Sequence, residues 1–560
     1  MLFSNRHFIA RALRTLLSMA IFWNAGLAYS QFGVSPSQSS GFFDDFRSRS
    51  KQMQQSGSGF KSGDVVYDYE SGTYKGNGDV QVRPDDLLRQ AREVAKPSML
   101  SGSGATAARS IADYTNYAGQ YNSPTGYFVP TYVSDPFLTG KRNLALGPVN
   151  IGLGLYSGLE YNSNVNRSNT APVSDFIGSM MFNLTANYRV TQNNVLSLTT
   201  AFGVDHYFQN PELAPYGNGN YILNVLPGST LAFDIKVGPI YMTFYDRVSV
   251  RPATNNAFAL NSTANFGVFQ NDAGVAMNWA INSKWSLSVN YNNSISSALQ
   301  DNSKQFNRQL DTLQGALTYS PHGTWSAGYE GIVTLLTYEE PVLNDGVLVN
   351  SGVFFRAPLG GSTFVRVAGG LQRFNFEEPT VFAPLGPGDS SDLSDYYFNF
   401  SVNHQINNRV SHVLSFGRES ALNLTSNFVT ANYVNYGVSI ITSKGGRLAI
   451  TGYHEEAEPS LFNPGYAQTQ APVTQYGLDT YYNHQITSKL SMGAGYHFGR
   501  TDSEAANTDF DQHAFSANLS MALTGKAMLN MGYRFLTTKT EVGNLDFNQH
   551  RIILGLSYNF

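Results

Sequence analysis

From about residue 144 to the C-terminus, the chain is a succession of runs in which apolar and polar residues alternate. Residues 286–292, for example, read Ser, Leu, Ser, Val, Asn, Tyr, Asn, and residues 397–403 and 529–535 alternate in the same way. A period of two predicts strands with one apolar face. The runs are about 10 to 14 residues long, and at ~3.3 Å per residue and a tilt near 40° ten residues rise roughly 25 Å, the height of the apolar band of a membrane barrel. Soluble strands average about five or six residues, so run length favours strands that cross a membrane.

The connections between the runs are of two kinds that take turns. Longer polar connections cover 164–174, 209–227, 377–393 and 455–474, while short turns lie at 191–194, 237–239, 281–284, 320–323, 358–361, 406–409, 442–446, 486–489 and 523–526. This rhythm predicts an all-β fold, a transmembrane antiparallel up-and-down β-barrel over residues 145–560. Counting the runs gives about 20 strands, within a range of 18 to 20, and a single-chain bacterial barrel has an even number. The stretches 220–236 and 253–282 are weakly patterned.

Composition excludes several classes of protein. The 560 residues include no Cys, which removes disulfides, thiolate metal sites, thiol nucleophiles and a lipid-modified N-terminal Cys. Mean hydropathy is -0.23, too low for a helical membrane protein. The net charge of -4 provides no basic surface for nucleic acid.

The N-terminus, residues 1–30, reads as a signal peptide for Sec export. Arg6, Arg11 and Arg14 precede the apolar run 16–27, and the small residues of 28–30 precede an expected cleavage at Gln31. A short membrane anchor is the alternative. It is disfavoured because polar residues interrupt the run, which is shorter than the roughly 20 residues that a span needs.

Residues 31–144 are expected to form a mostly irregular extension, either periplasmic or plug-like. A Ser- and Gly-rich linker precedes two alternating runs that predict a hairpin near 65–82, and Pro84 opens a helix expected near 84–96. The sequence of residues 67–68, 70–72 and 76–80 resembles a single repeat of the jelly-roll domain of lipopolysaccharide-transport proteins. That resemblance implies a lipopolysaccharide-transport or assembly role as an alternative, although a simple hairpin is the favoured interpretation.

The chain ends on a strand, 546–560, whose outward face carries Ile552, Leu554, Leu556, Tyr558 and Phe560. This terminus resembles the C-terminal signal of bacterial outer-membrane barrels. The resemblance implies that Phe560, Tyr558 and Leu556 form a barrel-insertion signal and that the barrel-assembly machinery is a partner. We expect the strand to pair with the first barrel strand, near 150–161, and so close the sheet.

The barrel opening at 152–165, the evenly spaced runs and the terminal Phe560 together resemble the beta-barrel porin family of bacterial outer-membrane proteins, whose members often accompany exopolysaccharide synthesis and export. The resemblance implies a multi-pass barrel in the outer membrane of a Gram-negative cell envelope, in contact with membrane lipid and lipopolysaccharide. It also implies passage or export of a hydrophilic solute, with polysaccharide as a candidate. A structural or surface-interaction barrel that binds envelope polymers is the alternative.

No enzyme, cofactor or metal site is expected. His484, His497, His513 and His550 are scattered, and no Ser, His and acid spacing indicates a catalytic site. Acidic pairs at 339–340, 377–378 and 455–456 with Glu458 are expected in loops, where solvated or lipopolysaccharide-facing side chains are favoured over a Ca²⁺ site.

Alternation predicts which polar residues line the lumen, where amide, Tyr and Arg side chains suit hydroxyl-rich or anionic solutes. An aqueous lumen of any function needs polar residues, and that simpler explanation is favoured over a specific sugar track. The lumen-lining candidates are Arg189, Tyr241, Arg247, Arg251, Gln314, Asn399, Asn403, Tyr433, Asn435, Gln475, Asp479, Asn530, Arg534 and Arg551.

Overall fold

The computed structural model describes residues 66–68, 73–75, 144–191, 194–214, 221–255, 264–300, 304, 307–321, 325–339, 344–360, 362–377, 391–422, 427–443, 445–460, 472–503, 509–541 and 546–560. The signal peptide over 1–30 and the helix over 84–96 lie outside the described residues. Within the hairpin expected near 65–82, the strands β1 (Val66–Asp68) and β2 (Thr73–Lys75) pair antiparallel.

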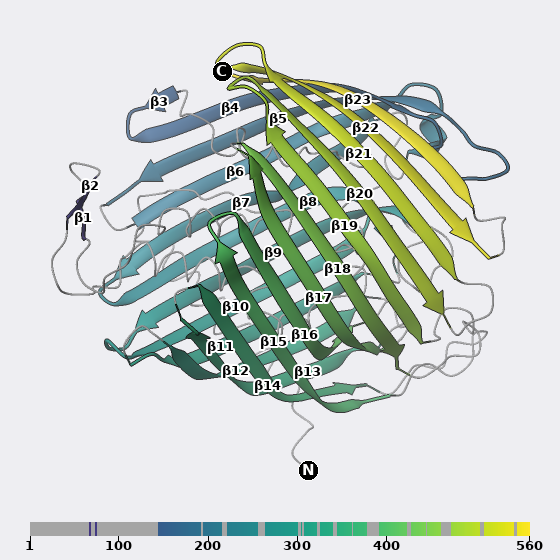
Figure 1. Cartoon of the computed structure of the whole chain (residues 1–560). Helices are drawn as coiled ribbons and strands as arrows, with labels where there is room; N and C mark the ends of the chain where they lie inside the picture. Colours follow the sequence, from purple (N-terminus) through teal and green to yellow (C-terminus); the bar gives the residue numbers. More distant parts are fainter. Residues whose placement is uncertain are drawn as a thin grey trace.

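Residues 144 to 560 form one closed antiparallel barrel (Figure 1). A short strand, β3 (Leu144–Leu146), pairs with the first strand of the wall. The wall strands are β4 (Val149–Asn162), β5 (Asp175–Arg189), β6 (Asn194–Tyr207), β7 (Tyr221–Val237), β8 (Ile240–Asn255), β9 (Ala264–Ala280), β10 (Trp285–Ala298), β11 (Arg308–Tyr319), β12 (Ser326–Tyr338), β13 (Gly346–Pro358), β14 (Thr363–Phe376), β15 (Leu393–Asn407), β16 (Val410–Leu422), β17 (Phe428–Ser443), β18 (Gly446–Pro459), β19 (Val473–Gln485), β20 (Leu490–Ser503), β21 (Phe510–Ala522), β22 (Ala527–Thr540) and β23 (Phe547–Asn559).

The wall closes where the two ends of the barrel sequence meet. Strand β23 pairs with β4 from Arg551 opposite Asn162 to Asn559 opposite Gly154. In Figure 1 the yellow C-terminal strands accordingly lie beside the blue strands that begin the barrel. The strands β4 to β23 number twenty, so both the predicted fold class and the predicted closing pair are confirmed.

All nine predicted short turns connect consecutive strands, and they lie at one end of the barrel, which we call the short-turn end. The longer connections lie at the other, the long-loop end. Two predicted loop boundaries are wrong. The loop expected over 209–227 ends before Tyr221, where β7 begins. Pro227 and Gly228 lie within β7, at a shift in its register between Val225 and Ser229, and do not mark the end of the loop.

The second wrong boundary concerns the acidic residues expected in a loop over 455–474. Strand β18 continues to Pro459, so Glu455, Glu456 and Glu458 are strand residues. Pairing register places Glu455 on the inner face of the wall and the other two on its outer face, where they are exposed. A carboxylate run suggests a solvated loop by composition alone, but strand pairing satisfies the backbone whatever the side chains are.

The outer face of the wall is apolar. On β23, Ile552, Leu554 and Leu556 are about half exposed, and comparable Leu, Phe, Val and Met side chains recur on the outer face around the barrel. The three tryptophans among the described residues, Trp279, Trp285 and Trp325, all lie at the short-turn end. Exposed apolar strands with aromatic residues at their ends are what a membrane barrel presents to lipid.

The inner face combines tyrosines with glycines. The Tyr453 ring lies so close to Gly477 that a Cβ on the glycine would be 2.5 Å from the Tyr453 hydroxyl oxygen. Tyr245 covers Gly274 in the same way, and Tyr156 covers Gly555 across the closing pair of strands. An aromatic ring that lies over a glycine shields its backbone and packs two strands together. No helix of the described residues is long and apolar enough to cross a membrane.

Candidate functional site: the inner wall of the barrel

Pairing register assigns each strand residue to the inner or the outer face, because residues that are directly opposite in neighbouring strands share a face. On this basis all fourteen lumen-lining candidates occupy inner-face positions in the strand register. Only the backbone of Arg251 is described.

The first polar cluster seals the closing pair of strands. Arg551 of β23 makes a bidentate ion pair with Glu160 of β4, with Nε to Oε1 and Nη2 to Oε2 both 2.6 Å. Arg551 is only 2% exposed. Arg534 of β22 stands directly opposite Arg551 in the next ladder. The two parallel charge-assisted bonds of this bidentate pair fix the orientation of both side chains, so side chains as well as the main-chain ladder hold β23 against β4.

The same closure carries polar contacts nearer the long-loop end. The Gln549 side-chain amide donates to the Asn164 carbonyl oxygen at 2.7 Å, and the Asn164 amide donates to the Asn548 carbonyl oxygen at 3.0 Å. The His550 N–H donates to Ser163 Oγ at 2.8 Å. The loop after the first wall strand is thus fastened to the last strand.

A second cluster spans β12, β14, β15 and β17. Arg366 Nη2 lies 3.2 Å from Glu330 Oε2, and both side chains are buried. The Tyr397 hydroxyl donates to Glu330 Oε1 at 3.4 Å. The amide of Asn399, one of the predicted residues, accepts from Arg366 and donates to the hydroxyl of Tyr433, another predicted residue. The network connects four strands on the inner face.

A third cluster lies on β19 and β20. His497 Nδ1 lies 2.8 Å from Asp479 Oδ1, and His497 is 2% exposed. The Gln475 amide donates to Thr501 Oγ1 at 3.0 Å, toward the long-loop end of the same pair of strands. Both predicted residues, Gln475 and Asp479, are thereby oriented by a partner on the neighbouring strand.

Two further candidates, Arg247 and Tyr241 of β8, contact inner-face neighbours. The Arg247 guanidinium lies over the Tyr245 ring at 4.4 Å, and the Tyr245 hydroxyl donates to Asn290 on β10 at 3.1 Å. The Tyr241 ring is contacted by the Lys236 ammonium at 5.2 Å. Cation–π contacts of this kind keep cationic groups flat against the wall.

Asn530 joins three strands near the end of the chain. It accepts a hydrogen bond from Ser520 Oγ at 2.8 Å and donates to Ser557 Oγ at 3.3 Å.

The fourteen candidates do not lie together in one place. They are distributed around the wall, and Arg189 is exposed at the end of β5 while Asn403 and Asn435 stand on β15 and β17.

Sequence reasoning missed several inner-face residues of these clusters, notably Glu160, Glu330, Arg366, Tyr245 and His497. Each one stands at an inner-face position of its strand, so alternation could have identified it once the strand was placed. The partnerships could not be found this way, because they depend on register between strands that lie far apart in the sequence. Glu160 and Arg551, for example, are 391 residues apart.

The scattered histidines separate by face. His497 is on the inner face, whereas His484, His513 and His550 are on the outer face, where His513 and His550 each contact a tyrosine hydroxyl. In the described part of the chain, no group of three or more His, Cys, Asp or Glu side chains is arranged to hold a metal ion.

One region of the inner face is apolar. Toward the long-loop end of β11 to β15, six buried inner-face side chains form a continuous cluster with Leu422 and Phe428 at the ends of β16 and β17, and Phe376 packs against it: Leu310, Leu336, Tyr338, Leu348, Phe374 and Leu393. An apolar cluster on the inside of a polar wall requires something to cover it, because exposed apolar area is unfavourable in water.

Comparison with known proteins yields barrels of distant sequence. No family model and no curated protein matches the chain. Among solved structures, the siderophore receptor PirA from Pseudomonas aeruginosa is 9% identical, with 73% of this chain and 80% of that chain covered and a TM-score of 0.43. OccK5 (OpdH) from the same organism is 9% identical, with 74% and 98% covered and a TM-score of 0.37. OccAB1 from Acinetobacter baumannii is 10% identical, with 75% and 99% covered and a TM-score of 0.40.

Proposed function

We propose that the protein is a porin-like barrel of a bacterial outer membrane through which hydrophilic solutes pass. The observation that carries this proposal is the division of one closed wall into an apolar outer face and a polar inner face. Twenty strands spaced ~4.8 Å apart and tilted about 40° enclose a cylinder roughly 40 Å across at the backbone. Wall side chains alone do not fill such a width, so water and solute have room.

The proposed orientation follows from the two ends of the barrel. Short turns face the periplasm in bacterial barrels and longer loops face the outside. The terminal Phe560, with Tyr558 and Leu556, then lies at the periplasmic interface, where the insertion signal would be read by the barrel-assembly machinery. The outer face would contact membrane lipid and, on the long-loop side, lipopolysaccharide.

Among hydrophilic solutes, we propose hydroxyl-rich ones, with polysaccharide as a candidate for export. The inner face offers amide, tyrosine and arginine groups, such as Asn403, Asn435 and Arg247, that donate and accept hydrogen bonds and present flat surfaces. Residues 31–144 are proposed as a periplasmic extension or plug, and Sec export as the route to the membrane.

The purified full-length protein in planar lipid bilayers should show stepwise ionic conductance. Proteoliposome swelling in solutions of neutral sugars of increasing size should then give the size limit of the pathway. A bilayer that stays sealed at all voltages with inserted, folded barrel would contradict the proposal. Repeating both measurements without residues 31–144 distinguishes a plugged pore, which would open, from a wall that does not conduct.

A further inference from the structure

The pairing of β15 with β16 stops before either strand ends. Their ladder runs from Asn407 opposite Val410 to Phe398 opposite Arg418. Beyond that point β15 remains paired with β14 as far as Leu393, and β16 remains paired with β17 as far as Leu422. At the long-loop end, therefore, each of the two strands is paired on one side only, and no backbone ladder joins them to each other.

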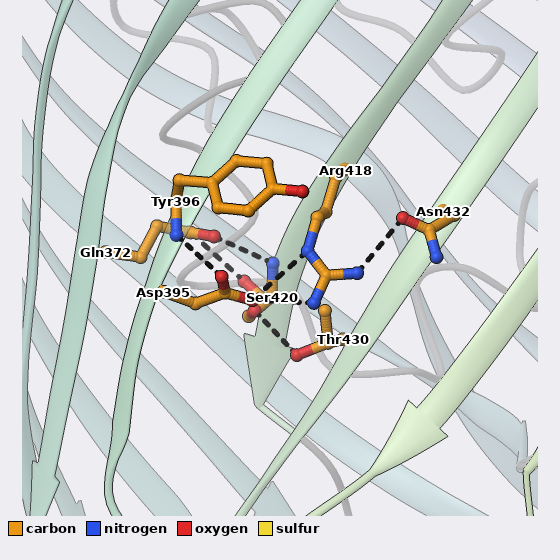
Figure 2. A network of polar contacts seen from close by, with 7 residues as sticks. All are labelled: Gln372, Asp395, Tyr396, Arg418, Ser420, Thr430 and Asn432. Atoms are coloured by element: carbon orange, nitrogen blue, oxygen red, sulfur yellow. Dashed lines mark hydrogen bonds and ion pairs between the residues drawn. The ribbon is translucent and has the colours of Figure 1, made fainter.

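Side chains occupy the place of the missing ladder (Figure 2). The Ser420 N–H donates to Gln372 Oε1 at 3.0 Å, and Gln372 Nε2 donates to the Ser420 carbonyl oxygen at 3.5 Å. Gln372 belongs to β14, so its side chain reaches past β15 to the backbone of β16. On the other edge, the Tyr396 N–H donates to the side chain of its own neighbour, Asp395, at 2.8 Å.

An arginine joins β15 and β16 at the point where their ladder stops. Arg418 Nη2 and Nε donate to Asp395 Oδ2 at 2.8 and 3.1 Å, and Arg418 Nη1 donates to Asn432 Oδ1 at 3.1 Å (Figure 2). This ion pair is partly exposed, so it holds the strands less firmly than the buried pairs of the wall.

The ends of β16 and β17 are folded into the barrel. Phe428 of β17 and Phe374 of β14 have ring centroids 6.3 Å apart, although three strand spacings along the wall amount to roughly 14 Å. Asn427 donates to the Ser391 carbonyl oxygen at 3.1 Å and accepts from the Asn344 amide at 3.0 Å. These contacts bypass the intervening strands, and Leu422 and Phe428 cover the apolar cluster of the inner face.

The closed arrangement leaves a polar group without compensation. Asn350, directly opposite Gln372 in the β13–β14 ladder, is 2% exposed, and neither atom of its amide has a hydrogen-bond partner among the described residues. A buried amide without a partner is unfavourable relative to a hydrated one. Movement of the folded-in segment away from the wall would admit water to the Asn350 amide. The free energy gained by hydrating this amide would offset part of the free energy lost with the apolar contacts.

We propose that residues Glu419–Leu422 and Asn427–Thr430 form a mobile flap that narrows the long-loop mouth of the barrel and moves outward to let solute through. The flap is joined to the wall on its β15 side by exchangeable side-chain contacts, while its own β16–β17 ladder lets it move as a unit. The apolar cluster and Gln372 hold it closed. The gating part of the inference rests on the proposed function, whereas the mobility of the flap does not.

Hydrogen exchange tests the mobility. In detergent or nanodiscs, the amides of Ser420–Leu422 should exchange at least tenfold faster than those of Val413–Gly417 on the same strand, and Gln372→Leu should increase their rate further. Gln512→Leu, which removes a comparable inner-face amide bonded to Thr538 on distant strands, is the control and should leave the flap unchanged. Exchange at Ser420–Leu422 as slow as at Val413–Gly417 would overturn the proposal, whatever the conductance.

Reversible cross-linking tests the gating. Because the chain has no Cys, Phe374→Cys with Phe428→Cys supplies the only thiols. Linking them with a short bis-methanethiosulfonate should reduce the open fraction in planar bilayers severalfold, reductant should restore it, and Gln372→Leu should increase it. If the flap amides exchange fast but the cross-link does not change the conductance, the gating part of the proposal is wrong. A barrel sealed in every variant, with fast flap exchange, would contradict the proposed function and support the mobile flap.

Discussion

At the scale of residues, three carboxylates of the inner wall are matched by partners on nearby strands. Glu160, Glu330 and Asp479 each have a buried cationic or histidine partner on a nearby strand. Removing one member of such a pair leaves a buried charge without compensation, whereas replacing both members by apolar groups is often tolerated. The inner-face pairs therefore contribute more to the specificity of strand pairing than to net stability.

Arg551→Ala should lower the free energy of unfolding by about 3 kcal/mol, because Glu160 is left buried beside the closing strands. The measurement is urea unfolding in detergent micelles, together with the temperature at which the barrel loses its folded mobility in SDS gels. Arg409→Ala, in an exposed short turn, is the control and should change little. If Glu160→Leu with Arg551→Met is as unstable as Arg551→Ala, the charge-pair explanation fails.

Gly477→Ala should destabilise the barrel by about 1–3 kcal/mol through overpacking. A Cβ at Gly477 would lie 2.4 Å from the Phe498 carbonyl oxygen and 2.5 Å from the Tyr453 hydroxyl oxygen. Gly452→Ala is the matched control on the facing strand, since the nearest atom to its Cβ is 3.8 Å away. Equal effects of the two substitutions on unfolding would argue that the tyrosine packing is unimportant.

Asp345, in the loop before β13, has its pKa raised above the ordinary value, first by burial and then by the charge of Glu377, although the hydrogen bond from the Tyr338 N–H opposes this. A raised pKa means that the fold favours the protonated carboxyl. That contribution to stability is present at low pH and is lost as the pH rises through the folded pKa. Exchange of the Tyr338 amide should therefore accelerate in that range, beyond the intrinsic effect of pH.

Asp345→Asn supplies the control for this pH dependence. The amide retains an oxygen acceptor for the Tyr338 N–H but carries no charge, so the extra acceleration should disappear. A wild-type protein and an Asp345→Asn variant with the same pH profile of Tyr338 exchange would show that burial of this carboxyl has no consequence for the loop.

At the scale of elements, the alternation of each strand determines which side faces lipid, and that is why faces could be predicted residue by residue. The failures occur where composition and pairing conflict. Pro227 and Gly228 suggested a loop within what is the first half of β7, and the carboxylates of 455–458 suggested a loop where β18 continues. The interrupted seam between β15 and β16 has no local sequence signal, because Gln372, Asp395 and Ser420 acquire their roles only when three strands are aligned.

Leu554→Arg should destabilise the barrel by about 2–4 kcal/mol and reduce the yield of folded protein, because an arginine near the middle of the lipid-facing band is removed from water. Leu554 is 49% exposed on the outer face of β23. The same substitution at His550, closer to the long-loop interface, should cost about 0–1 kcal/mol. Equal folding of the two variants in lipid vesicles would contradict placement of the bilayer on this surface.

At the scale of the whole molecule, the rhythm of short and long connections predicted the strand number, the closure and the location of the two ends. It could not predict what narrows the lumen. The folded-in ends of β16 and β17 depend on contacts such as that between Phe374 and Phe428, which link strands that are not neighbours. Information of that kind is absent from periodicity, which describes one strand at a time.

Arg247→Gln should shift the cation-to-anion permeability ratio toward cations by about fourfold, since a unit charge about 10 Å from a passing ion contributes about 0.4 kcal/mol in water, with opposite signs for cations and anions. The measurement is the reversal potential across a bilayer under a salt gradient. Arg373→Gln removes the same charge from the exposed outer face of β14 and should leave selectivity unchanged. A shift with Arg373→Gln as large as that with Arg247→Gln would place the ion pathway elsewhere.

The pairing of β23 with β4 has a consequence for how the molecule is made. The partner of the first wall strand is the last strand of the wall to be synthesised, so every earlier stage of wall assembly leaves two unsatisfied strand edges exposed. The contact that ends this condition spans nearly four hundred residues, and long-range closure of this kind is slow. Completion is therefore a single late event, and a chain truncated by even one strand would lose its partner for β4 and remain an open, association-prone sheet.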